Sequence, residues 1–114
     1  MTRLKPWSKQ PTPKQLISRR SEEGRYIWGN RTINAFAKED VAGKTDYELP
    51  WSADADELRA DDKEVLRTGE PIFRHEYVDK SGKGKATLSV SKFLGELDGT
   101  RCVMGVSFVI EQRP

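Results

Sequence analysis

The stretch KATLSVSKFLGELDGTRCVMGVSFVI, residues 85–110, decides the fold prediction. Its first part alternates apolar and polar side chains at every second position, which is the pattern of a half-buried β-strand. The Asp98-Gly99 pair follows, and this dipeptide favours a two-residue turn between antiparallel strands. The sequence therefore predicts a hairpin whose strands span residues 85–94 and 101–110.

The second strand of this hairpin is apolar on both faces. One face carries Cys102, Met104, Val106, Phe108 and Ile110, and the other carries Val103, Gly105 and Val109. A strand of this kind lies at the centre of a sheet or is covered on its outer side. We expect a neighbouring segment or a second copy of the chain to pack there. The candidate dimer or partner face consists of Cys102, Met104, Val106 and Phe108.

Residues 54–68 carry the clearest helix pattern in the chain. Asp54 is a favourable capping residue, and Glu57 three positions later completes a capping-box pattern. Gly69 suits the left-handed position that ends a helix. The predicted apolar stripe consists of Leu58, Val65 and Leu66.

Acidic residues gather along this predicted helix. They are Asp54, Asp56, Asp61 and Asp62. Their spacing lacks the loop geometry that wraps carboxylates around calcium, so we interpret them as a solvated helix face. The chain has one cysteine and one histidine, which are too few for a zinc site of the usual ligands. No metal site is predicted.

The segments before the long helix predict two short strands and a short helix. The β-prone runs at residues 16–17 and 26–28 flank a turn at residues 21–24, which indicates a hairpin. Apolar residues recur at helical spacing between residues 31 and 38. Residues 72–78 predict one more strand after the long helix. The predicted order is two strands, short helices, one longer helix and three antiparallel strands.

That order, with the residues at its joints, resembles the PAS domain family of sensor modules. The matching stretches are Gly24-Arg25-Tyr26, residues 43–51, residues 62–71, Ser91-Lys92, Asp98-Gly99 and Gly105-Val106-Ser107. The resemblance implies an α+β fold, with a five-stranded antiparallel sheet in the order 2-1-5-4-3. It also implies that short helices and one longer helix cover one face and enclose a small cavity.

The resemblance defines one domain over residues 15–111, with a basic, proline-containing arm at residues 1–14 and a tail at residues 112–114. Family members that drive an output commonly end the last strand in Asp-Ile-Thr. This chain has Val109-Ile110-Glu111 there, followed by no signalling helix or effector domain. This departure from the family pattern counts against direct transmission to an attached effector.

The implied cavity is the candidate ligand site. Its predicted lining includes Trp51, Leu58, Leu88, Lys92 and Ser107. The resemblance argues against haem, because the long helix and the turn before it contain no histidine, and His75 falls on a strand. It also argues against a covalent flavin adduct, since the Asn-Cys-Arg context is missing. Non-covalent flavin or another small ligand stays open.

Two tryptophans fit either the core or the cavity wall. We favour a core position for Trp28 and leave Trp51 open between the two. The chain shows no primed nucleophile and no pair of titratable groups placed for acid–base chemistry, so no enzymatic activity is predicted.

Charge is distributed unevenly along the chain. Residues 1–20 carry six basic side chains and no acid, whereas the remainder has a net charge of −4. Such an arm could contact nucleic acid or an acidic partner, although a solvated tail is the simpler interpretation. No apolar run reaches the roughly 20 residues needed to cross a bilayer. A lone cysteine fits the reducing cytoplasm.

These observations predict a non-catalytic, cytoplasmic sensory or interaction module that binds a small ligand or a protein partner and forms a homodimer through the outer sheet face. The alternative is an accessory, transcription-related protein that uses residues 1–14 to bind nucleic acid or an acidic partner.

Overall fold

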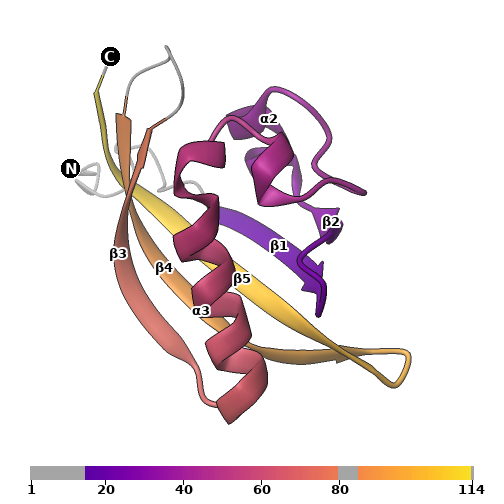
Figure 1. The fold of residues 1–114 in the computed structure, drawn as a ribbon. Coiled ribbons are helices and arrows are strands. Elements are labelled where there is room, and N and C mark those ends of the chain that lie inside the picture. Colours follow the sequence, from indigo (N-terminus) through magenta and orange to yellow (C-terminus); the bar gives the residue numbers. More distant parts are fainter. Residues whose placement is uncertain (1–14, 80–84, 114) are drawn as a thin grey trace, which may run out of the picture.

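The computed structural model describes residues 15–79 and 85–113 (Figure 1). In chain order the elements are β1 (Gln15–Ser21), β2 (Tyr26–Gly29), α2 (Arg31–Ala37), the 3-10 helices η1 (Asp46–Glu48) and η2 (Ser52–Asp54), α3 (Ala55–Thr68), β3 (Ile72–Asp79), β4 (Lys85–Leu97) and β5 (Thr100–Arg113). The basic arm and most of the turn predicted after β3 lie outside the described residues. No helix in the described part of the chain is long and apolar enough to cross a membrane.

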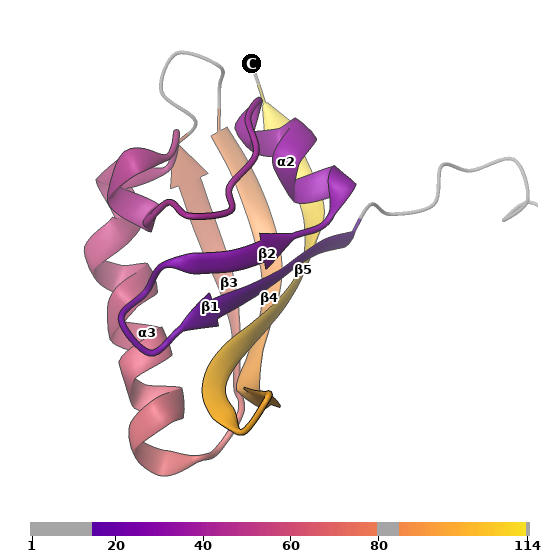
Figure 2. The same cartoon turned by 90° about the vertical axis from the view of Figure 1, so that its right-hand side faces the viewer.

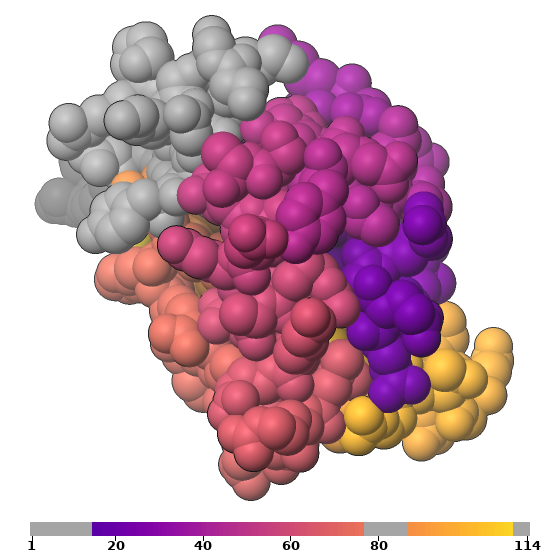
Figure 3. Space-filling model, in the orientation of Figure 1, coloured from indigo at the N-terminus to yellow at the C-terminus, as the bar shows by residue number. Residues whose placement is uncertain are grey.

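The five strands form one antiparallel sheet in the order β2-β1-β5-β4-β3. The order predicted from the resemblance is therefore confirmed, and β5 lies in the middle, as its two apolar faces indicated. The helices all cover one face of the sheet (Figures 1 and 2). In the space-filling view α3 lies across that face, and the tip of the β4–β5 hairpin projects beyond it (Figure 3).

The backbone conformation agrees with the sequence prediction at a strand turn and at the end of a helix. Asp98 and Gly99 both have positive φ angles, 51° and 80°, as the two-residue turn favoured by Asp-Gly requires. Gly69 has φ 74° and donates its backbone N–H to the Val65 carbonyl at 2.8 Å, which closes the end of α3. Strand β5 continues to Arg113, two residues past the predicted domain end.

The predicted capping box at the start of α3 is wrong. Asp54 is the residue before α3, but its side chain makes no capping hydrogen bond. The turn η2 leads directly into α3, and the Asp54 backbone N–H already bonds to the Trp51 carbonyl at 2.9 Å. A helix that is entered from a preceding 3-10 turn has fewer unsatisfied N–H groups to cap.

The prediction that Trp28 belongs to the core is also wrong. The register of β1 and β2 shifts between Arg19 and Arg20, so that Tyr26 pairs with Arg20 and Trp28 with Arg19. Tyr26 consequently faces the helices, whereas Trp28 lies on the outer face with half of its surface exposed. A bulge of this kind changes which residues point inward.

Asp62 corrects a third expectation, that of a solvated acidic face. The inward side of α3 consists of Ala55, Leu58, Asp62 and Val65. These positions are three or four residues apart, so they share one face of the helix. Asp62 is fully buried in the middle of that face. Its carboxylate therefore needs partners from the sheet.

Candidate ligand cavity

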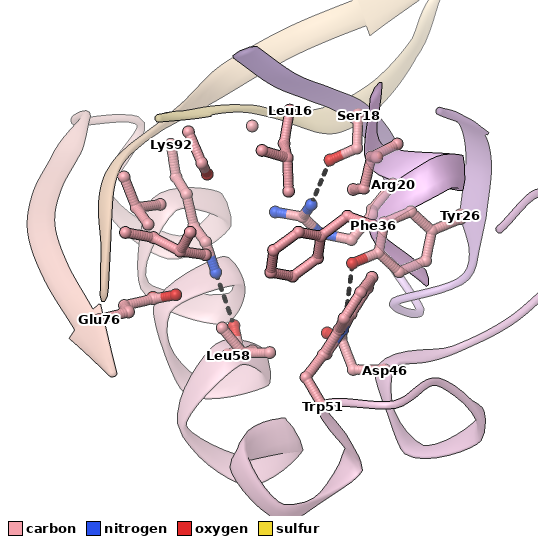
Figure 4. Close-up of a pocket in the computed structure, with 15 residues that line it drawn as sticks. Leu16, Ser18, Arg20, Tyr26, Phe36, Asp46, Trp51, Leu58, Glu76 and Lys92 are labelled. Carbon is pink, nitrogen blue, oxygen red and sulfur yellow. Dashed lines mark hydrogen bonds between the residues drawn. The ribbon is translucent and has the colours of Figure 1, made fainter. Parts of the chain in front are cut away.

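A cavity of about 50 Å³ lies between the inner face of the sheet and the helices (Figure 4). All five residues predicted as pocket lining contribute to its wall: Trp51, Leu58, Leu88, Lys92 and Ser107. They come from α3, from the segment before it, from β4 and from β5. The fold thus brings together residues that lie up to 56 positions apart in the sequence.

Most of the polar and aromatic side chains of the cavity wall were not predicted from the sequence. The further lining residues that matter here are Ser18, Arg20, Tyr26, Phe36, Asp46 and Glu76. A usable signal was present in β1, where Leu16, Ser18 and Arg20 alternate with outward residues. This period of two places Arg20 on the same face as Leu16.

Arg20, Lys92 and Asp62 form a buried ionic cluster beside the cavity. Arg20 holds the Asp62 carboxylate with two parallel bonds, Nε to Oδ2 at 2.7 Å and Nη2 to Oδ1 at 2.8 Å. Lys92 Nζ lies 3.2 Å from the same Oδ1 and donates to the Leu58 carbonyl at 3.1 Å. Arg20 Nη1 also donates to Ser18 Oγ at 2.6 Å. The cluster ties β1 and β4 to the middle of α3.

The protonation states in this cluster follow from its geometry. Burial alone would raise the pKa of Asp62, but attraction and hydrogen bonds from Arg20, then Lys92, outweigh it and lower the pKa to about 2. Burial alone would lower the pKa of Arg20, and Asp62 raises it above its usual value. Both groups are therefore charged at neutral pH.

Asp46 is a second polar centre in the wall. Its Oδ1 accepts hydrogen bonds from Tyr26 Oη at 2.7 Å and from Trp51 Nε1 at 2.8 Å. Burial, opposed by the charge of Arg20 and assisted by Asp46, raises the pKa of Tyr26 well above its usual value, so the phenol is a neutral donor. Phe36 packs against Trp51 with ring centroids 6.0 Å apart. Asp46 thus fixes the aromatic side of the cavity.

Glu76 on β3 is partly buried and reaches toward Lys92 and Leu58 in Figure 4. Within the described residues, its carboxylate makes no hydrogen bond or ion pair. Burial raises its pKa, the nearby charge of Lys92 opposes this, and Asp61 adds to it. Glu76 is therefore the one acidic group of the described cavity wall that lacks a partner.

An open groove of about 600 Å³ runs along the outside of this wall, between α3 and β3. It is lined by Asp54, Glu57, Leu58, Ala60, Asp61, Arg74, His75 and Glu76. Leu58 and Glu76 belong to both the groove and the internal cavity. These two side chains therefore separate the cavity from the groove.

The outer face of the sheet differs from the inner one. Its most exposed large apolar side chains on the central and β3-side strands are Phe73 at 72% and Ile110 at 54%, followed by Phe93 at 38%. Of the predicted partner face, Met104, Val106 and Phe108 are partly exposed. Cys102 is buried at 1%, so its thiol adds nothing to the surface of a single chain.

The size of the cavity restricts what it holds. Ligand sites for drug-sized molecules measure roughly 300–1,000 Å³, and this cavity has about 50 Å³. A three-ring flavin, left open by the sequence, is larger than that volume. No group of three histidine, cysteine or acidic side chains suited to a metal ion occurs among the residues that the structure describes.

The sequence pattern of the PAS fold matches residues 15–113. The chain belongs to the PAS family. PAS domains generally serve as sensory modules. A search of curated proteins gave no match.

Several solved structures share the fold at low sequence identity. VqmA of Vibrio cholerae superposes with a TM-score of 0.72 and 14% identity, over 89% of this chain and 47% of that one. The PAS domain of an HTR-like protein from Haloarcula marismortui gives 0.67 and 16%, over 84% and 81%. PAS-B of Drosophila melanogaster Cycle gives 0.64 and 16%, over 83% and 99%. The present chain spans about half the length of VqmA.

Proposed function

We propose that this PAS domain is a non-catalytic sensory module that binds a small ligand in its internal cavity. The observation that carries the proposal is the composition of the cavity wall. Aromatic and aliphatic side chains surround a few placed polar groups, which is the usual make-up of a ligand site. A wall that served packing alone would have no use for the unpartnered carboxylate of Glu76, because burying such a group costs free energy.

Two structural neighbours support this proposal. A VqmA structure is described as bound to DPO, and the PAS-B domain of Cycle is described with bound ethylene glycol. Both are statements about those proteins. They support the proposal because the shared fold holds small molecules in those proteins, and ethylene glycol is of a size suited to a cavity of about 50 Å³.

Native mass spectrometry and an absorption spectrum of freshly purified protein provide the first test. We expect a small retained molecule, or, if it is lost during purification, shifts of the amide signals around the cavity when small polar molecules are added. Leu88→Phe would fill the space and abolish these shifts, whereas the matched outer-face variant Phe73→Leu would keep them. Small molecules that shift no signals near the cavity would contradict the proposal.

The second part of the proposal is a homodimer formed through the outer sheet face. Apolar side chains there remain exposed in an otherwise polar chain, and exposed apolar patches mark contact surfaces. The contact face now consists of Met104, Val106 and Phe108, with Phe73 and Ile110 beside them. Sedimentation at high micromolar concentration would show dimer, and monomer alone would refute it. A cytoplasmic location belongs to the same proposal.

The alternative role, in which the basic arm binds nucleic acid, has less support from the described residues. Arg20 is one of the six basic residues at positions 1–20 that suggested nucleic-acid binding, but it is buried and paired with Asp62. Arg19 is half-buried in β1, where its Nε contacts Met104 Sδ at 3.1 Å. Deleting residues 1–13 and measuring binding to duplex DNA at two salt concentrations would test the alternative, because phosphate contacts weaken steeply with salt.

A further inference from the structure

In the part of the chain that the structure describes, one carboxylate beside the cavity is left without a direct partner. Arg20, Arg59 and Lys92 all pair with the carboxylate of Asp62. The carboxylate of Asp46, in the cavity wall, accepts two side-chain hydrogen bonds. The remaining carboxylate, Glu76, has no partner among the described residues. Glu76 thus offers the cavity a hydrogen-bond acceptor that no described donor occupies.

The approach to the cavity has the same sign. The groove outside Glu76 and Leu58 is lined by four carboxylates, against Arg74 and His75. Arg74 Nε pairs with Asp61 at 2.9 Å, so the positive charge in the groove is already matched. A groove lined by acidic groups raises the local concentration of cations and repels anions.

We propose that the cavity selects a small organic cation, of the size of an amidinium or a short alkylammonium, whose N–H groups bond to Glu76. The inference rests on the proposed function, since it names the ligand class for the same cavity. The cation enters between Leu58 and Glu76 from the acidic groove. Glu76 is the residue that determines the charge preference.

The aromatic wall favours the same class of ligand. Phe36 and Trp51 pack against each other on the side of the cavity fixed by Asp46. Aromatic faces attract organic cations, and the attraction is stronger where water is excluded from the pair. A flat cation therefore finds a hydrogen-bond acceptor at Glu76 and ring surfaces in the same cavity wall.

An anionic ligand fits these observations less well. It would have to approach through the acidic groove and place a second negative charge beside the carboxylate of Glu76, which pairs with no described residue. Its only strong donors would be Arg20 and Lys92, which already bond to Asp62. Binding there would separate a buried ion pair and leave the Asp62 carboxylate without its partners, which is strongly unfavourable.

Three molecules of nearly identical shape test the charge preference: acetamidinium, acetamide and acetate. We would titrate each into the ¹⁵N-labelled full chain and follow the amide signals of residues that line the cavity. Acetamidinium should bind at least about tenfold more tightly than acetamide, a difference of about 1.4 kcal/mol, and acetate should bind most weakly. Glu76→Gln should remove the advantage of the cation, whereas Glu57→Gln, in the groove but outside the cavity, should reduce it by less than threefold.

The possible results separate this inference from the proposed function. If none of the three molecules shifts the signals of cavity residues, the proposed function itself fails. If acetate or acetamide binds as tightly as acetamidinium, or if Glu76→Gln leaves the order unchanged, the cavity binds ligands but the inference is wrong. Glu76→Asp keeps the charge and should keep the preference for the cation, which provides a second variant if Glu76→Gln does not fold.

Discussion

The two faces of the sheet differ in where they place charged and large apolar side chains. The inner face, under the helices, holds the ionic cluster of Arg20, Lys92 and Asp62. The outer face, which no described helix covers, exposes Phe73 and Ile110. A sheet that served only to build a core would carry no charged side chains on its covered face and few large apolar ones on its open face. The charged groups therefore lie where water is excluded and their interactions are strong, and the apolar groups lie where another surface can reach them.

The largest expected effect comes from breaking the ionic cluster on the inner face. Asp62→Asn would leave Arg20 and Lys92 buried without their shared counter-charge. We expect the free energy of unfolding to fall by about 3–5 kcal/mol, as measured by urea denaturation. The neighbouring variant Asp61→Asn removes an ion pair to the half-exposed Arg74 and should cost at most about 1 kcal/mol. If both variants lost the same free energy of unfolding, the buried ion pairs of Asp62 would stabilise the fold no more than the partly exposed pair of Asp61.

Lowering the pH should reduce the contribution of Asp62 to the free energy of unfolding over a defined pH range. Because the pKa of Asp62 is lowered to about 2 in the folded chain, its contribution is complete above its unfolded pKa of about 4 and is lost as the pH falls toward 2. A shift of this size corresponds to about 2 kcal/mol. Urea denaturation between pH 6 and pH 2 should show this loss of unfolding free energy. In Asp62→Asn, the unfolding free energy should fall less over the same pH range, because the titrating carboxylate is absent.

A matched pair of tryptophan variants compares the faces directly. Trp51→Phe removes the donor to Asp46 inside the cavity wall and should cost about 1–2 kcal/mol of unfolding free energy. Trp28→Phe, on the half-exposed outer side, should change it by less than about 0.5 kcal/mol. A Trp28 variant that is as unstable as the Trp51 variant would show that the outer face is packed against something in solution.

The smallest effect on stability is expected at Phe73, which is 72% exposed. Phe73→Ser should change the free energy of unfolding of the monomer by about 0.5 kcal/mol or less. The same substitution should weaken self-association in sedimentation experiments, whereas Glu96→Gln at the exposed end of β4 should not. Unchanged association in both variants would place the dimer contact elsewhere.

The sequence predicted the order of elements well, because turns and alternation are local signals. Asp98-Gly99 specified the hairpin turn, and the doubly apolar β5 specified the centre of the sheet. The sheet order itself came from the resemblance to PAS domains. Trp28 was misassigned because a one-residue shift between Arg19 and Arg20 reverses the faces of β2, and no local pattern marks that shift.

The candidate site was predictable in its apolar part and in Lys92, whose alternation with Leu88 and Val90 placed it inward. The burial of Asp62 was missed because a charged residue is usually expected on the solvent-exposed face of a helix, whatever its position in the helical repeat. It lies four residues after Leu58 and three before Val65, which by periodicity alone assigns it to the buried stripe. The sheet supplies the closest counter-charge, since Arg20 lies 42 residues away in the sequence, and Arg59 on α3 adds a longer contact at 3.3 Å.

The central place of β5 has a consequence for how the domain is made. On the ribosome, the β1–β2 pair emerges first and the β3–β4 pair later. These two pairs are joined into one sheet only by β5, which lies between β1 and β4 and is made last. Nascent chains that end before β5 would expose two separate pairs of open strand edges, which are prone to aggregate. Stable folding during translation therefore has to wait for the last segment of the sheet, as the many long-range pairings of β5 require.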